Sequence, residues 1–138
     1  MQLTFSTERL CFPVSDKLME ILQTAVSNVK NLPTVLTIIF KDTSYSPTTG
    51  GFHPVEIRLL KYKQHWVFDY ITDFSFQGLG DTSELTKEID FNFIDQTTYH
   101  LYSGDHKAQN TVALFNLWQA NFISYVKMEV FTVKVTES

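Results

Sequence analysis

One stretch decides the expected fold of this chain, GFHPVEIRLLKYKQHWVFDYITDF, residues 51–74. Its first half alternates in the manner of a half-buried strand, with three apolar residues on one face: Val55, Ile57 and Leu59. A second strand over 66–74 follows a turn at Lys63 and Gln64, so the stretch predicts an antiparallel hairpin.

The residue types on the two faces of this hairpin support one register, in which Arg58 lies opposite Asp69. In that register the core face carries Val55, Ile57, Leu59, Trp66, Phe68 and Tyr70. The other face carries Glu56, Arg58, Asp69 and Asp73, which form either a polar recognition surface or the solvated side of the sheet. An exposed charge pair contributes only about 0.2–1 kcal/mol, so the Arg58–Asp69 pair indicates the register more than it stabilises the sheet.

Further elements are expected on both sides of the hairpin. In chain order they are a helix from Asp16 to about Asn31 with Ser15 as N-cap, an interior strand over 34–41, a short helix over 82–87 with a capping box of Asp81 and Glu84, a strand over 97–102, a long helix over 105–127 and a closing strand around 131–135. The expected class is therefore α+β: an antiparallel sheet with an N-terminal amphipathic helix, a long C-terminal helix packed on it and a closing strand.

Composition limits the classes of protein. The 138 residues suit a single domain, 1–138, with a core large enough to be stable without disulfides or a structural metal. The net charge is -4 and the basic residues are scattered, which argues against nucleic-acid binding. No apolar run is long enough to span a membrane, and the single Cys11 and the lack of a signal-like start favour the reducing cytoplasm.

Aromatic residues are unusually frequent, at 14% of the chain. They either fill a Phe-rich core or line a surface for a ligand or partner. The apolar stripe of the long C-terminal helix, which includes Trp118, is wide enough to require cover from a curved sheet or from a second copy in a homodimer.

His53 is the residue with the clearest chemical interest. The hairpin brings it towards Asp73, with Glu56 nearby, and a carboxylate that orients a histidine makes it a general base. The structural alternative is that Gly50, Gly51 and the His53-Pro54 pair only start a strand. No cofactor and no metal are expected, because the spacing of the other candidate ligands, His100, Asp105 and His106, matches no recurrent metal motif.

Four blocks of the sequence resemble those of a bacterial family of unknown function found in gammaproteobacteria, sometimes on mobile gene cassettes. They are YSPTTGGFHPVEIRL (45–59), FDYITDFSFQGLG (68–80), EIDFNF (88–93) and LWQANFISYVKMEVF (117–131). The resemblance covers nearly the whole chain and implies a small, stand-alone bacterial protein. It implies no activity and no catalytic residues.

Two functional hypotheses remain open. The first is a non-enzymatic binding module for a protein partner, a second copy of the chain or a small apolar ligand. Its binding residues would be Tyr45, Phe52, His53, Arg58, Asp69 and Trp118. The second is a small metal-independent enzyme that uses His53 with Asp73 or Glu56 as its acid–base group.

Overall fold

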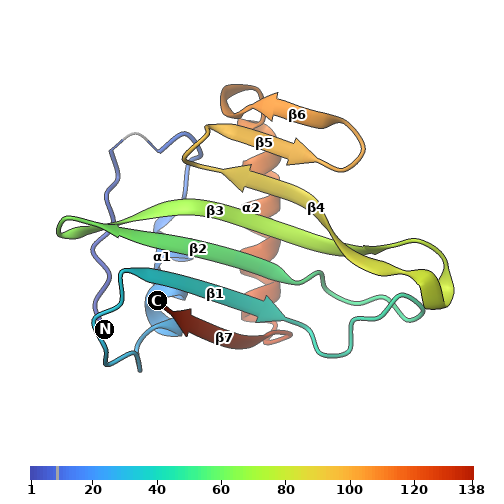
Figure 1. The fold of residues 1–138 in the computed structure, drawn as a ribbon, viewed down its shortest axis with the longest axis horizontal. Coiled ribbons are helices and arrows are strands. Elements are labelled where there is room, and N and C mark those ends of the chain that lie inside the picture. Colours follow the sequence, from blue (N-terminus) through green and yellow to red (C-terminus); the bar gives the residue numbers. More distant parts are fainter. Residues whose placement is uncertain (9) are drawn as a thin grey trace.

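The computed structural model of the protein describes residues 1–8 and 10–138, except for the side chain of Asp81, so the capping role expected of Asp81 lies outside the described part. In chain order the elements are α1 (Asp16–Ala25), β1 (Val35–Lys41), β2 (Val55–Tyr62), β3 (His65–Gln77), η1 (Gly80–Thr82), β4 (Glu84–Asn92), β5 (Thr97–His100), β6 (Gly104–Lys107), η2 (Ala108–Asn110), α2 (Val112–Lys127) and β7 (Thr132–Glu137). The described strands form one seven-stranded antiparallel sheet in the order β6-β5-β4-β3-β2-β1-β7 (Figure 1). The α+β class is confirmed.

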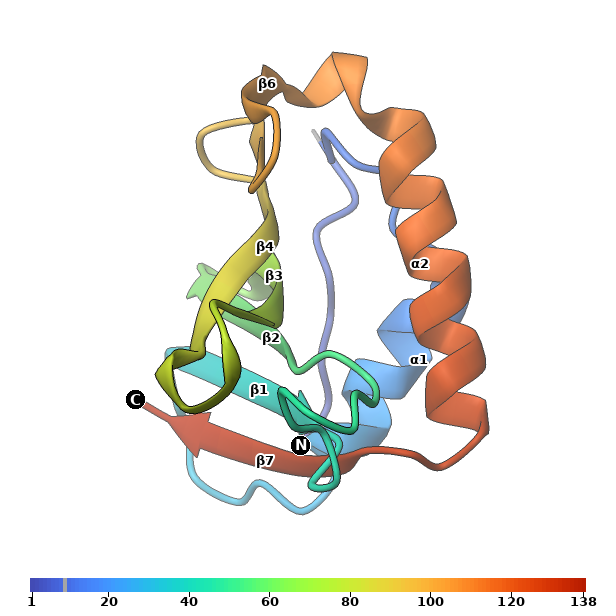
Figure 2. The same cartoon turned by 90° about the vertical axis from the view of Figure 1, so that its right-hand side faces the viewer.

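The sheet and the helices form two layers. Figure 2 shows α1 and α2 on the same face of the sheet, and α2 runs across the strands rather than along them. The chain before α1 passes between the layers, where the Trp66 amide donates to the Thr4 carbonyl at 2.8 Å. Within the described residues, no helix is both long and apolar enough to cross a membrane.

The core lies between these layers and is rich in phenylalanine. Phe12, from the segment before α1, is fully buried and packs its ring against Phe91 and Phe93 of the sheet side and Phe115 of α2, with ring centroids 5.0–5.3 Å apart. Trp118 and Phe122 of α2 are also buried and stack at 5.0 Å. Seven of the twelve phenylalanines and both tryptophans are buried, so the core takes up much of the aromatic content of the sequence.

Two expected helix boundaries and one whole expected helix are wrong. α1 ends at Ala25 rather than near Asn31, and its N-cap is Ser15, whose Oγ accepts from the Leu18 amide at 3.2 Å. The helix expected over 82–87 does not form, because the 3-10 helix η1 ends at Thr82 and the chain from Glu84 pairs with β3 as β4. The long helix begins at Val112 rather than near Asp105, since 104–107 pairs with β5 as β6 and 108–110 forms only the short 3-10 helix η2. In both cases strand pairing overrides a local helical signal.

The hairpin of β2 and β3 is confirmed, with Ile57 and Phe68 both buried on the core face. Its register shifts at one point, however. Leu59 pairs with Phe68 whereas Arg58 pairs with Tyr70, which leaves Asp69 as an extra residue in β3. This β-bulge reverses the alternation beyond it.

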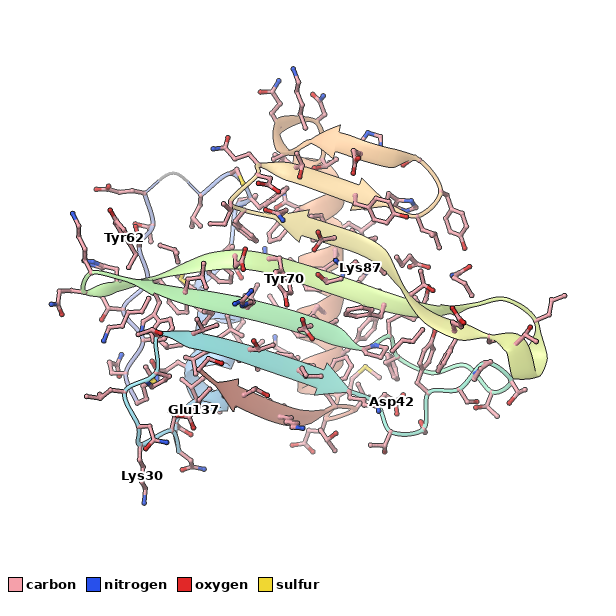
Figure 3. All side chains as sticks on the ribbon, viewed as in Figure 1. Lys30, Asp42, Tyr62, Tyr70, Lys87 and Glu137 are labelled. Carbon is pink, nitrogen blue, oxygen red and sulfur yellow. The ribbon has the colours of Figure 1, made fainter. Side chains whose placement is uncertain are left out.

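The bulge corrects two expectations. Tyr70 does not face the core but lies on the outer face, where its hydroxyl donates to Glu56 (Figure 3). Asp73 pairs with Val55 and so faces the helices rather than the polar outer face. Arg58 still forms an ion pair with Asp69, at 3.4 Å, although the two residues are not directly opposite.

The loop between β1 and β2 is held by Asp42, which follows β1 (Figure 3). Its carboxylate accepts from the Ser44 amide at 2.9 Å and from the Phe52 amide at 3.0 Å. Gly51 adopts φ +136°, and a Cβ there would lie 2.9 Å from both Asp42 Oδ2 and Tyr45 Cα, so only glycine fits. These contacts place Phe52 and His53 in the loop just before β2.

We predict that Ile57→Ala and Ile39→Ala differ in their effect on stability, because they remove the same atoms from opposite faces of the sheet. Ile57 is fully buried against the helices, whereas Ile39 is half-buried on the outer face. Ile57→Ala is expected to lower the free energy of unfolding by about 2–5 kcal/mol, and Ile39→Ala by clearly less. Urea denaturation measures both, and equal losses would contradict the two-layer arrangement.

A second prediction concerns pH. The amide of Phe52, and then the hydroxyl and amide of Ser44, lower the pKa of Asp42 by hydrogen bonding to its carboxylate. The stability contributed by this ionised group is present above its unfolded-state pKa and is lost as the pH falls through its lower folded-state pKa. The difference in unfolding free energy between the wild type and Asp42→Asn should therefore shrink as the pH falls from neutral to below the ordinary pKa of an aspartate. A difference that stays constant would contradict this role.

Candidate functional site

A pocket of about 300 Å³ lies between α2, the loop that leads into β2, and interior residues of β3 and β4. Its walls are mostly apolar and aromatic: Phe52, Val55, Ile89, Leu114, Leu117, Trp118, Phe122, Tyr125 and Phe131. Three titratable side chains also line it, namely His53, Asp73 and Glu88. Apolar walls with a few converging polar groups are the usual composition of a small-molecule site.

His53, Asp73 and Glu88 make up the polar group of the pocket, and His53 and Asp73 form its centre. His53 Nδ1 lies 2.8 Å from Asp73 Oδ1, and Asp73 Oδ2 accepts from the indole nitrogen of Trp118 at 3.0 Å. Both oxygens of Asp73 are therefore bonded, one to the loop before β2 and one to α2. This chain of contacts fixes the orientation of the carboxylate between the sheet and the helix.

Glu88 completes the group from the neighbouring strand. Its Oε2 lies 3.6 Å from His53 Nδ1, and its Oε1 accepts from the Ser75 hydroxyl at 3.1 Å. Glu88 occupies a second bulge, because Asp73 pairs with Ile89 and Phe74 with Lys87, which leaves Glu88 as the extra residue of β4. The bulge directs its side chain to the same face as Asp73.

The electrostatics of this group are dominated by its carboxylates. The hydrogen bond to Asp73 raises the pKa of His53, aided by the negative charges of Asp73 and Glu88 and opposed by partial burial. The His53 side chain is 35% exposed and that of Asp73 is 13% exposed. Among the described lining residues there is no Lys or Arg, so the pocket favours neutral or cationic groups over anions.

Aromatic rings surround the polar group. The Tyr45 ring lies 5.4 Å from the His53 ring and stacks on Phe76 at 5.0 Å, and its hydroxyl accepts from the Phe76 amide. The Phe52 ring lies 4.7 Å from that of Tyr125 in α2. These contacts tie the loop before β2 to both the sheet and α2.

The structure brings together some of the residues expected to form a site and separates others. His53, Asp73, Phe52 and Trp118 line the pocket, and Tyr45 lies beside His53. The other expected residues, Glu56, Arg58 and Asp69, lie on the outer face of the sheet, away from His53. Glu56 is therefore not an orienting partner of His53, because it alternates to the outer face and accepts from Tyr70 instead.

Sequence reasoning missed Glu88. Simple alternation with Ile89 and Phe91, which are core residues, places Glu88 on the outer face. Only the bulge, which depends on pairing with β3, brings it into the pocket. In contrast, His100 and His106 interact locally, with the Tyr102 amide and the Ser103 hydroxyl, and form no three-ligand group with Asp105 among the described residues.

Comparison with known proteins places the chain in a family. A family model described as a protein of unknown function (DUF2787) matches residues 15–136. The hypothetical protein VC0508 from the VSP-II pathogenicity island of Vibrio cholerae is 30% identical, with a TM-score of 0.91, and the match covers 99% of this chain and 100% of that chain.

A second solved structure is the conserved hypothetical protein VC1805 from the Vibrio cholerae pathogenicity island VPI-2, described as sharing structural homology with the human P32 protein. It is 31% identical, with a TM-score of 0.81, over 92% of this chain and 97% of that chain. No curated protein matches. The expected membership of an uncharacterised family is thus confirmed, and the chain belongs to the DUF2787 family of proteins of unknown function.

Proposed function

We propose that this protein is a non-enzymatic binding module, and that its ligand is a small molecule with a largely apolar body held in the pocket beside α2. The observation that carries the proposal is the composition of that pocket. Rings and aliphatic side chains form its walls, while hydrogen-bonding groups gather at His53, Asp73 and Glu88. Its volume of about 300 Å³ lies at the lower end of the range for ligand sites and suits a compact ligand.

The pocket is a better-supported site than the aromatic stripe of α2. Four aromatic residues of α2 suggest a homodimer seam. Of these, Phe115, Trp118 and Phe122 are at most 8% exposed in one chain, and Tyr125 is half-buried and lines the pocket. Leu117 remains 61% exposed, and it lies at the pocket. The exposed apolar surface of α2 is thus better explained by a ligand than by a second copy of the chain.

The charge of the pocket narrows the chemistry of this ligand. Asp73 and Glu88 contribute two negative charges, and among the described lining residues His53 is the one that becomes a cation on protonation. An anionic head group would meet uncompensated carboxylates and would also lose its own hydration. The ligand is therefore neutral or carries a hydrogen-bond donor or a positive charge at the end that meets Asp73 and Glu88.

The two tryptophans make this proposal testable by NMR. The Trp118 indole N–H donates to Asp73 in the pocket, whereas Trp66 lies in a separate hollow near the N-terminus. In a screen of a neutral and cationic fragment library, binding fragments are expected to shift the Trp118 indole resonance and leave that of Trp66 in place. A library in which no fragment shifts Trp118 would count against the proposal.

Two matched variants control the fragment experiment. Asn121 lines the pocket from the exposed side of α2, so Asn121→Trp is expected to fill the pocket and weaken fragment binding at least tenfold, a loss of about 1.4 kcal/mol. Asn116, equally exposed on the same helix, lies outside the lining, and Asn116→Trp is expected to leave binding unchanged. Equal effects of the two variants would place the fragments elsewhere.

Acid–base catalysis by His53 is the second candidate, and one observation favours it. Asp73 is held by Trp118 and in turn holds His53 Nδ1 at 2.8 Å, which is the arrangement that orients an imidazole whose second nitrogen serves as the base. No Ser or Cys lines the pocket among the described residues, so the chemistry favoured is proton transfer rather than formation of a covalent intermediate.

Ligands found in the fragment screen discriminate between the two candidates. If the protein only binds them, the wild type returns each one unchanged after prolonged incubation, as followed by mass spectrometry or by ligand NMR. If His53 is a general base, the wild type converts or exchanges a proton of the ligand, and His53→Gln binds the same ligand without doing so. Conversion that persists in His53→Gln would remove His53 from the reaction.

A further inference from the structure

We propose that the polar group of the pocket is a site for one divalent transition-metal ion of the Zn²⁺ class, with His53 Nδ1, Asp73 Oδ1 and Glu88 Oε2 as its protein ligands. The ligand atoms of these three residues lie within 4.8 Å of one another. The proposal goes beyond ligand binding and does not rest on it, because a metal ion alone is sufficient to occupy the group.

The distances suit an ion of this size. Zinc binds nitrogen and carboxylate oxygen at about 2.0–2.2 Å, so two ligands of a tetrahedral ion lie roughly 3.4 Å apart. His53 Nδ1 and Glu88 Oε2 are already 3.6 Å apart. His53 Nδ1 and Asp73 Oδ1 are closer, at 2.8 Å, because they share a proton. Replacing that proton by the ion requires the two atoms to separate by only about half an ångström.

The surroundings of the carboxylates match those of metal ligands. Each carboxylate directs one oxygen towards His53 and uses the other to accept a hydrogen bond, Asp73 from Trp118 and Glu88 from Ser75. The Ser75 hydroxyl is held in turn by Gln77 Nε2 at 2.8 Å. Such outer contacts orient metal-binding carboxylates and are characteristic of metal sites.

The charge and the position of the group also favour a cation. Two carboxylates lie side by side on a sheet face that otherwise packs against helices, and a single histidine offsets only one of their charges. A divalent ion would compensate both. Imidazole nitrogen with carboxylate oxygens suits zinc, cobalt and manganese, whereas magnesium prefers oxygen ligands alone.

The pocket leaves room for further ligands of the ion. Three protein ligands leave at least one coordination position of a four-coordinate ion for water or another molecule, which is the arrangement of metal sites with an accessible position. The open volume beside the three side chains is bounded by rings such as Trp118 and Phe122. A molecule that reaches the ion would therefore have an apolar body and one donor atom.

Metal titration tests the proposal directly. The full chain, freed of purification tags and stripped with a chelator, is titrated with Zn²⁺ by calorimetry and with Co²⁺ by visible absorption. We expect one equivalent of metal per chain, with Mg²⁺ bound at least a hundredfold more weakly than Zn²⁺. The Trp118 indole resonance should shift on Zn²⁺ addition, because its acceptor Asp73 becomes a ligand, and that of Trp66 should not. The absence of stoichiometric Zn²⁺ binding would overturn the proposal.

Variants locate the ion. Glu88→Gln keeps the shape of the side chain and is expected to weaken Zn²⁺ binding at least tenfold, as is His53→Ala. Ser75→Ala, which removes only an outer contact of Glu88, is expected to weaken it about tenfold. Controls are His65→Ala at the exposed start of β3 and Glu84→Gln at the exposed start of β4, and both should leave Zn²⁺ affinity unchanged. Equal Zn²⁺ affinity in Glu88→Gln and the wild type would refute the metal site. That result would leave the binding of fragments to the metal-free protein unaffected.

Discussion

Asp69 is an extra residue in β3. It decides which side of the sheet each later residue of that strand faces. Two residues of β3 oppose one position of β2 at this point, so Ile71 and Asp73 turn towards the helices while Tyr70 turns outwards. The bulge is supported on both sides, because the Asp69 carboxylate pairs with Arg58 at 3.4 Å and its carbonyl accepts from the Phe93 amide at 2.9 Å. Without this shift Asp73 would not meet Trp118 or His53.

A second bulge brings Glu88 to the same place, and the two together put carboxylates on the face of the sheet that packs against the helices. Burying carboxylates is costly unless they are hydrogen-bonded or paired. Here the Trp118 indole, the Ser75 hydroxyl and His53 provide those contacts. These polar residues break the apolar pattern of the core and are held in place by several elements. Folded proteins depart from such a pattern mainly at functional sites, so function is expected here.

The aromatic residues serve two purposes that composition alone does not separate. Phe12, Phe91 and Phe115 are fully enclosed and hold the sheet to α2. Phe52 and Tyr125, at the edge of the same layer, make the walls of the pocket. The pocket is thus an extension of the core at the end where the loop before β2, anchored through Asp42, replaces regular structure.

The sequence by itself determined the α+β class, the β2–β3 hairpin and the opposite faces of Ile57 and Arg58, because period-two alternation and turn residues act between near neighbours. It also indicated the His53–Asp73 pair, but it put Tyr70 and Asp73 on the wrong faces, offered Glu56 as another partner of His53 and did not find Glu88. The helix expected over 82–87 failed for a related reason, since a local capping signal is weaker than pairing along β3. Only the tertiary structure decided which carboxylates meet His53, because a bulge is set by pairing between strands, and one extra residue reverses every side chain after it.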